Sequence, residues 1–187
     1  MSERAHHHGM KFLASLRMND RHGIAREARF YGEHSEWRLR GFSGGLDYEH
    51  DGVCRAVLAF VKEALIAYEL DGIEFDFMRF CHMFHPSGVE GNAPFLTDMM
   101  RRSRDILDDT AARRRVDRLI LSVRVPQTLD ECRTLGLDVA AWISKGLVDY
   151  VCPMDFFYTD MNIRTEDFVA LTEGTPCKVL PGIHPLI

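Results

Sequence analysis

The chain has 187 residues, 46% of them hydrophobic, which is enough for one globular domain with a substantial core over residues 1–187. Its 28 acidic and 23 basic residues give a net charge of −5, which argues against nucleic acid as the main partner. No apolar run is long enough to cross a membrane and no signal-peptide core opens the chain, so we expect a cytoplasmic protein without a membrane partner.

Five cysteines are scattered along the chain without a CxxC pair, and an odd number cannot complete a set of disulfides. We expect mostly buried thiols in a reducing compartment. The three histidines at residues 6–8 precede a glycine, a pattern that indicates the end of a helix rather than a metal site. The sequence predicts neither a cofactor nor a bound metal.

Predicted strands and helices alternate along the chain. Alternation of this kind implies a parallel sheet whose strands all end at one edge. The last three strands begin about thirty residues apart, the spacing expected for the units of an eight-stranded barrel. We predict strands at residues 11–18, 71–80, 118–125, 148–156 and 178–183, and helices at 51–70, 94–114, 138–145 and 165–172, with a long functional loop at 20–51.

Residues 71–80, DGIEFDFMRF, carry most of the fold prediction. Ile73 and Phe75 lie on one face of this strand, and Glu74 and Asp76 lie on the other. The pattern suits the wet face of a half-exposed strand, but it also fits a barrel, with apolar residues under helices and polar residues in the lumen. A doubly wound sheet would bury both faces. We therefore predict an α/β protein of the (β/α)8 TIM-barrel class, partial, with about five parallel βα units visible.

Further details of the helices follow from residue types at their ends. Asp51 is placed to cap the first long helix, and Pro94 is placed in the first turn of the second. In the first helix the apolar stripe extends to Phe60 and Tyr68. The arginines near residues 101–115 are expected on a solvated face.

Asp76 lies near the C-terminal end of its strand and is the first candidate for chemistry. We expect Arg17 and Arg124 at the ends of neighbouring strands, where their charges would favour the ionised form of Asp76. That form suits a nucleophile or a transition-state stabiliser. Glu74 lies two residues deeper, about 6.6 Å back along the strand, and is either a supporting residue or the acid.

Several stretches together resemble the TIM-barrel hypothetical glycoside hydrolases, the glycosyl-hydrolase-like 10 group and its relatives. They cover nearly the whole chain and are HHHGMKFLASLRMND, EHSEW, GLDYEH, AYELDGIEFDFMRF, LILSVRVP and GLDVAAWISKGLVDYVCPMDFF. The resemblance implies a carbohydrate substrate and hydrolysis of a glycosidic bond. A DG pair followed by alternating acids occurs in several groups of barrel glycosidases, so it indicates the superfamily better than the activity.

The resemblance has two departures. Members of the family are full barrels, and the visible units correspond to strands three through seven, which predicts open sheet edges that favour self-association. A chitinase-type pattern, DGxDxDxE, would place its acid glutamate where this chain has Met78. That difference weakens a chitinase assignment.

Glycoside hydrolysis needs a second carboxyl group, and its identity is left open by the sequence. Asp155 lies at the C-terminal end of the fourth predicted strand, although strict alternation points its side chain away from the lumen. Glu36, Asp160 or a residue outside the visible units are the alternatives. We take Asp76, Glu74 and Asp155 as the catalytic candidates.

Arginine forks and aromatic rings supply the predicted substrate contacts, because guanidinium groups donate to hydroxyls or carboxylates and rings stack on sugars. An internal ion-pair network of the arginines with Glu74 and Asp76 is the alternative. The substrate-binding candidates are Arg17, Asn19, Asp20, Trp37, Arg79, Arg124, Tyr158 and His184.

Two other classes of function fit the same residues. One is a degenerate barrel that binds sugar without turning it over, as the missing acid at Met78 suggests. The other is a metal-dependent barrel enzyme, which would use Glu74, Asp76, Asp155 and His184 as ligands but lacks an HxH or HExxH signature.

Overall fold

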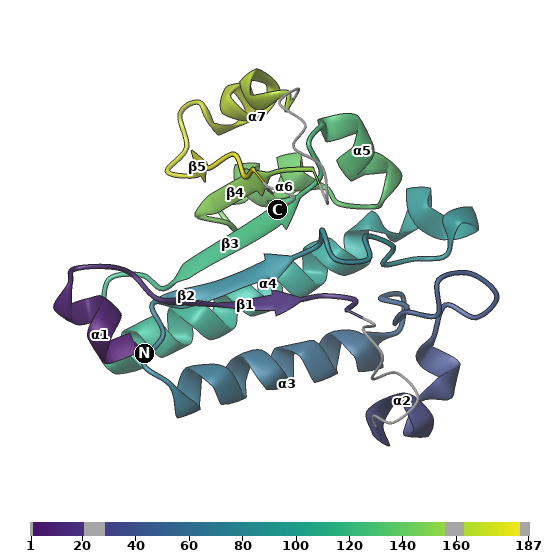
Figure 1. Ribbon diagram of the computed structural model, residues 1–187, viewed down its shortest axis with the longest axis horizontal. Coiled ribbons are helices and arrows are strands. Elements are labelled where there is room, and N and C mark those ends of the chain that lie inside the picture. Colours follow the sequence, from purple (N-terminus) through teal and green to yellow (C-terminus); the bar gives the residue numbers. More distant parts are fainter. Residues whose placement is uncertain (1, 21–28, 156–162, 184–187) are drawn as a thin grey trace.

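Five parallel strands form one sheet in the computed structural model, which describes residues 2–20, 29–155 and 163–183 (Figure 1). Each strand pairs with the next one in the chain, so the spatial order is the sequence order. This is the strand order of a (β/α)8 barrel, and it confirms the predicted α/β fold class with five parallel strands in the described residues. The strands are β1 (Leu13–Arg17), β2 (Gly72–Asp76), β3 (Ile120–Val125), β4 (Tyr150–Pro153) and β5 (Lys178–Val179).

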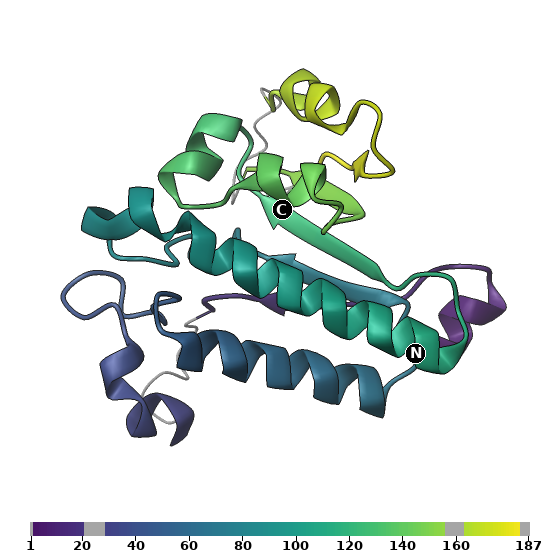
Figure 2. The ribbon, with the colours of Figure 1, turned by 180° about the vertical axis from the view of Figure 1, so that it is seen from behind.

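Helices connect the strands, and the two long ones cover one face of the sheet. Figure 2 shows α3 and α4 side by side across that face, where they contact each other. Within the described residues, no helix combines the length and apolar character that crossing a membrane requires. The helices are α1 (Ser2–His7), α2 (Arg29–Glu33), α3 (Asp51–Ala67), α4 (Val89–Arg114), α5 (Leu129–Thr134), α6 (Val139–Ser144) and α7 (Thr165–Thr172), with 3-10 turns at Ser35–Trp37 and Pro86–Gly88.

The apolar face of β2 packs under these helices, as its alternation predicted. Ile73, Phe75 and Phe77 are all buried in the core. The ring of Phe77 lies 5.6 Å from that of Trp142 in α6, centroid to centroid. Burial of side chains of this size contributes about 1.5 to 3 kcal/mol each, so this face fixes which way β2 lies in the sheet.

The DG pair that precedes the acids has a structural role at the opposite end of β2. A Cβ atom on Gly72 would lie 2.1 Å from the carbonyl oxygen of Ile120, so only glycine allows β2 and β3 to approach this closely. The carboxylate of Asp71 accepts hydrogen bonds from the backbone N–H of Phe12, at 2.8 Å, and from Lys11, at 3.1 Å. The pair therefore joins β1, β2 and β3 at their N-terminal ends.

The predicted start and apolar stripe of α3 are wrong in part. His50 is the N-cap residue, and Asp51 is already helical and forms an ion pair with Arg102 of α4 at 2.8 Å. Phe60 and Tyr68 are 53% and 65% exposed. The predicted buried stripe includes too many residues, because contact with the sheet and α4 buries only part of the apolar residues on this helix.

The predicted start of α4 is also wrong. The helix begins at Val89, directly after the 3-10 turn, so Pro94 lies inside it rather than in its first turn. The inner stripe that includes Leu96, Met99 and Met100 is buried as predicted.

The arginines of α4 do not all lie on a solvated face, which corrects that prediction. Arg104 is buried and forms an ion pair with Asp149 at 2.9 Å. Arg114 donates hydrogen bonds to the carbonyl oxygens of Leu65, Tyr68 and Leu70. These carbonyls lie at and just beyond the end of α3, where helical acceptors lose their regular partners, so Arg114 closes that helix.

The last third of the chain follows the predicted order with shorter strands. The strands expected at 148–156 and 178–183 are Tyr150–Pro153 and Lys178–Val179, although Met154 and Gly182 form a further isolated bridge. Helix α5 was missed, although its T-x-x-E start is a capping-box signal: Thr128 and Glu131 each accept a hydrogen bond from the other's backbone N–H. Helices α6 and α7 lie where they were predicted.

Candidate functional site

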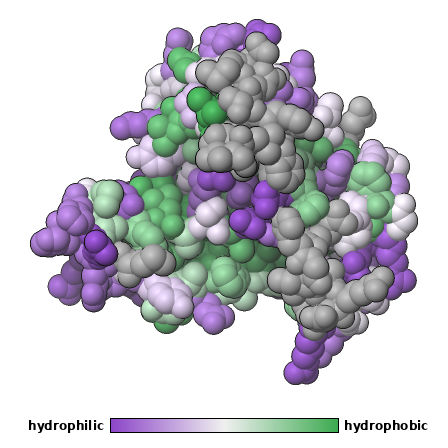
Figure 3. All heavy atoms as spheres, in the orientation of Figure 1, coloured by the Kyte–Doolittle hydropathy of each residue, from purple (hydrophilic) through white to green (hydrophobic). Residues whose placement is uncertain are grey.

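The second face of the sheet is polar and carries the predicted site residues. In register, Arg17 lies opposite Asp76, and Asp76 lies opposite Arg124. Figure 3 shows hydrophilic side chains gathered near the centre of the face seen in Figure 1, which is opposite α3 and α4. A pocket of about 350 Å³ opens there and is lined by Ser15, Arg17, Asp76, Met78, Arg79, Arg124 and Met154. We call it the strand-end pocket.

Arg124 connects the two carboxylates of β2. Its Nη2 atom lies 2.9 Å from Oε1 of Glu74, and its Nη1 atom lies 3.5 Å from Oδ2 of Asp76. The side chain of Asp76 is 5% exposed, and its Oδ1 atom accepts a hydrogen bond from the backbone N–H of Met78 at 2.9 Å. The alternative of an internal ion-pair network is thus present in the structure for Arg124.

Glu74 is fixed more fully than Asp76. Besides Arg124, it accepts hydrogen bonds from Ser15, at 2.8 Å, and from Ser122, at 3.4 Å. It is absent from the lining of the strand-end pocket, whereas Asp76 is part of it. The arrangement leaves Asp76 as the carboxylate of β2 that faces the pocket.

The three candidates at the end of β1 have different surroundings. Nη1 of Arg17 forms an ion pair with Asp20 at 2.9 Å, and the side chain of Arg17 is 51% exposed. Asn19 is buried, where its Nδ2 atom donates to the carbonyl oxygens of Leu46 and His82 and its Oδ1 atom accepts from the N–H of Leu46. The amide of Asn19 therefore holds two loops together instead of facing the pocket.

Trp37 packs within its own segment of the long loop. Its ring stacks on that of His34 with 3.7 Å between centroids and meets Phe30 edge-on. The indole also covers Gly52 at the start of α3, where an added Cβ atom would lie 2.4 Å from it. The structure does not bring Trp37 to the strand-end pocket.

Asp155 lies near Asp76 in electrostatic terms, although it does not line the pocket. Burial raises the pKa of the Cys81 thiol to about 11, and the negative charges of Asp76, Glu131 and Asp155 add to the rise. Both aspartates therefore act on one thiol that follows β2. In the parallel sheet, Asp76 ends β2 and Asp155 comes just after β4, so both lie at the C-terminal edge.

The remaining candidates do not join the pocket in the described chain. Glu36 is exposed and lies 3.6 Å from His34. Tyr158, Asp160 and His184 lie outside the described residues. Across residues 2–20, 29–155 and 163–183, no three histidine, cysteine or acidic side chains group closely enough to hold a metal ion. The five cysteines are free thiols.

Sequence reasoning overlooked two contributors to the site. The Ser122 hydroxyl donates a hydrogen bond to Glu74, and the charges of Asp76 and Asp155 raise the pKa of the Cys81 thiol. Ser122 carried a usable signal, since it occupies an inward position of β3 next to Arg124 in the alternation. Cys81 carried none, because it lies in a loop without periodicity.

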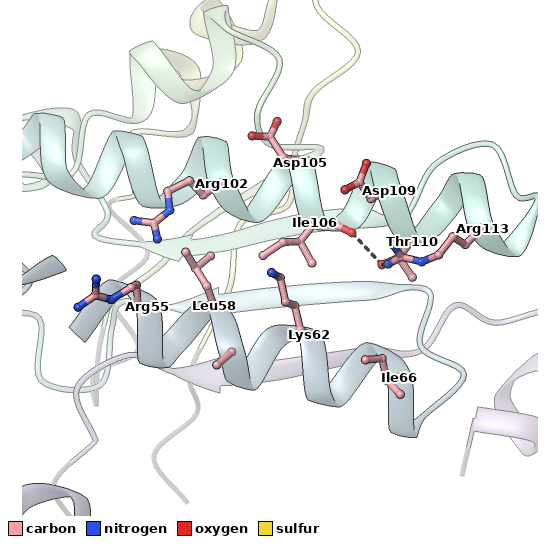
Figure 4. Close-up of a pocket in the computed structure, with 11 residues that line it drawn as sticks. Arg55, Leu58, Lys62, Ile66, Arg102, Asp105, Ile106, Asp109, Thr110 and Arg113 are labelled. Carbon is pink, nitrogen blue, oxygen red and sulfur yellow. Dashed lines mark hydrogen bonds between the residues drawn. The ribbon is translucent and has the colours of Figure 1, made fainter. Parts of the chain in front are cut away.

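A larger cavity of about 820 Å³ lies between α3 and α4, on the outer side of the molecule (Figure 4). Lys62 and Ile66 of α3 face Ile106 and Thr110 of α4 across it, and the Thr110 hydroxyl donates to the carbonyl of Ile106 at 2.8 Å. Its walls are two helices on the face opposite the polar strand residues. Barrel active sites form at strand ends, so size alone does not make this groove the functional site.

Comparison with known proteins defines the fold. No family model matches the sequence, and no curated protein matches it. Among solved structures, the α-galactosidase from Thermus thermophilus in complex with stachyose resembles the chain with a TM-score of 0.51 and 16% identity, over 88% of this chain and 33% of that one. The described residues have the fold of part of a (β/α)8 barrel, with five of its parallel strands. At this identity the likeness establishes the fold and no more.

Two further solved structures have lower TM-scores. A glycoside hydrolase family 18 N-acetylglucosaminidase from Paenibacillus barengoltzii gives 0.46 at 18% identity, over 57% of this chain and 30% of that one. The glycoside hydrolase domain of PelA from Pseudomonas aeruginosa gives 0.46 at 13% identity, over 81% and 53%. The barrel fold of this chain thus spans between about a third and about half of the length of these three proteins.

Proposed function

We propose that this protein hydrolyses an O-glycosidic bond of a carbohydrate, with Asp76 as the nucleophile or ionised carboxylate. The observation that carries the proposal is the position of Asp76, a nearly buried carboxylate at the C-terminal end of a parallel strand that lines the strand-end pocket. Catalytic residues of barrel enzymes come from the strand ends at this edge. The glycosidase named in the structural comparison supports the carbohydrate class.

Asp76 is held in a defined orientation, as a reacting group needs to be. The backbone N–H of Met78 fixes Oδ1, and Arg124 lies near Oδ2. Glu74 acts through Arg124, because its ion pair and its hydrogen bond from Ser15 fix the guanidinium beside Asp76. In this proposal Glu74 is a positioning residue.

Asp155 is the proposed general acid. Its support is its position just after β4, at the sheet edge where β2 ends with Asp76, and its charge, like that of Asp76, raises the pKa of the Cys81 thiol. A general acid protonates the leaving-group oxygen, so its loss matters little when the leaving group is already a good one. We expect Asp155→Asn to lose hydrolysis of alkyl glycosides but to retain most hydrolysis of dinitrophenyl glycosides.

A non-catalytic sugar-binding barrel is the second candidate, and the position of Met78 favours it. This side chain lines the strand-end pocket at the position where the chitinase-type pattern places its acid. A thioether cannot donate a proton, so a barrel that relied on this position has lost its acid.

Turnover separates the two candidates. Wild-type protein is incubated with a panel of oligosaccharides and polysaccharides, and new reducing ends are counted while binding is followed by NMR. Release of reducing ends that is lost in Asp76→Asn but kept in Asp47→Asn supports the hydrolase. Binding without release in the wild type would overturn it in favour of the binding barrel.

A further inference from the structure

Among the described residues, the lining of the strand-end pocket holds more cationic than anionic side chains. Three guanidinium groups and one carboxylate line it, although the whole chain carries a net charge of −5. Asp20 and Glu74, which form ion pairs with Arg17 and Arg124, are not part of the lining. A ligand in the pocket therefore faces more cationic than anionic groups.

Arg17 is the lining arginine best placed to meet a ligand. Both terminal nitrogens of Arg124 already lie against Glu74 and Asp76. In the described chain only Nη1 of Arg17 has a partner, Asp20, and half of the Arg17 side chain is exposed. Its Nε and Nη2 atoms form the edge of a planar fork that suits a carboxylate.

The size and the remaining walls of the pocket suit one sugar ring. Its volume of about 350 Å³ is at the small end of the range for ligand sites, about 300 to 1,000 Å³. Met78 and Met154 add two polarizable thioether side chains, which pack against irregular apolar surfaces such as the C–H face of a sugar.

We propose that the strand-end pocket takes a hexuronate unit, whose carboxylate is bound by the guanidinium of Arg17. The inference rests on the proposed function only in placing a saccharide in this pocket. A neutral sugar would leave the Nε and Nη2 edge of Arg17 without an anion, since Asp20 lies against Nη1, whereas a hexuronate supplies one planar carboxylate on a ring of the same size. Arg17 is then a specificity-determining residue for the acidic substrate.

The test uses NMR titration of the whole chain with monosaccharides that are not hydrolysed. D-glucuronate is compared with D-glucose, and D-galacturonate with D-galactose, at pH 7 and physiological salt. We expect at least one uronate to bind about tenfold tighter than its neutral parent, a difference of about 1.4 kcal/mol. Arg17→Met should remove that preference, and Arg17→Lys should restore only part of it because lysine lacks the fork.

Arg101→Met is the matched control, because Arg101 is a similarly exposed arginine that also pairs with aspartates. It should keep the full preference. Equal binding of uronate and parent sugar, no binding of either, full preference in Arg17→Met, or equal competition by acetate would each overturn the inference.

This outcome is distinguishable from that of the proposed function. Hydrolysis of neutral glycosides without uronate preference keeps the glycosidase and removes the acidic substrate. Uronate preference that depends on Arg17, found without any turnover, keeps the acidic ligand and removes the glycosidase.

Discussion

The Nη2 atom of Arg124 lies 2.9 Å from Oε1 of Glu74, which makes an ion pair between neighbouring strands on the polar face of the sheet. The same guanidinium reaches Asp76 more loosely, at 3.5 Å. Glu74 and Asp76 occupy equivalent positions in the sequence pattern, but their contacts with Arg124 differ. Glu74 is tied to the sheet, and Asp76 is left to line the strand-end pocket.

Replacing Arg124 by methionine should destabilise the fold. The change leaves Glu74 and Asp76 without their shared cation, and both are largely buried. Removing one partner of a fully buried pair costs about 3 to 5 kcal/mol, and the partial exposure of Arg124 reduces our expectation to about 2 kcal/mol of unfolding free energy. Urea denaturation measures it.

The control for this prediction is Arg101→Met, which removes an exposed arginine and should change the unfolding free energy little. Adding Glu74→Gln to Arg124→Met should recover part of the loss, because it removes one uncompensated charge. A double variant less stable than Arg124→Met would show that the ion pair is not the cause.

Asn19→Ala should loosen the loop that contains Leu46. It removes three hydrogen bonds to buried backbone groups of Leu46 and His82, which we expect to cost about 2 to 4 kcal/mol. Hydrogen exchange should show loss of protection at the Leu46 amide. Asn92→Ala, which removes a single bond of 3.3 Å to Glu49, should cost less. An unchanged Leu46 exchange rate would show that the loop is held by other contacts.

Gly72→Ala should be among the most damaging single-methyl additions in the chain. The new Cβ atom would lie 2.1 Å from the Ile120 carbonyl oxygen, so β2 and β3 must separate, at a cost of more than about 3 kcal/mol. Gly91→Ala in α4 meets nothing within 4 Å and should instead stabilise by about 0.5 to 1 kcal/mol. Thermal unfolding of both variants checks the pair, and similar midpoints would contradict the clash.

Asp71 should contribute to the acid sensitivity of the fold. Burial opposes its ionisation, yet hydrogen bonds from the Phe12 backbone, His6 and Lys11 outweigh burial and hold its pKa below the ordinary value. Because the folded-state pKa is the lower one, the stabilisation is present above pH about 4 and is lost as the pH falls through the folded-state pKa.

The measurement for Asp71 is the unfolding free energy of wild type and Asp71→Asn between pH 2 and 6, a range set by the ordinary aspartate pKa of about 4. The gap between the two curves should be constant at the upper end and should narrow toward the lower end. Asp117→Asn, an exposed aspartate, serves as the control and should follow the wild-type curve. A gap that stays constant down to the lowest pH would exclude the effect.

The sequence was most informative where structure follows a local period. Alternation along residues 71–80 predicted that Phe75 packs under the helices while Asp76 lies on the polar face, because side chains of a strand alternate strictly. The row of Arg17, Asp76 and Arg124 followed from aligning parallel strands at their C-terminal ends. The order of the strands follows from the barrel prediction, because strands that are consecutive in the chain are neighbours in a (β/α)8 barrel.

The sequence was least informative where one side chain serves a distant segment. Asn19 bonds to loops 27 and 63 residues away, and Arg114 bonds to carbonyls 44 to 49 residues earlier. The residues that flank Asn19 and Arg114 in the sequence give no indication of these distant partners. Trp37 is a predicted sugar contact, and its packing against His34 and Gly52 could not be foreseen, because a tryptophan in a loop carries no periodic signal.

The most direct test of the central claim is the rate at which Asp76→Asn hydrolyses an activated aryl glycoside that the wild type accepts. The substitution is nearly isosteric, so the pocket and the hydrogen bond from Met78 should persist in the folded variant. Loss of an essential catalytic carboxylate should lower kcat by about a thousandfold or more. A folded Asp76→Asn that keeps wild-type kcat would contradict the assignment of Asp76 as the group that carries the reaction.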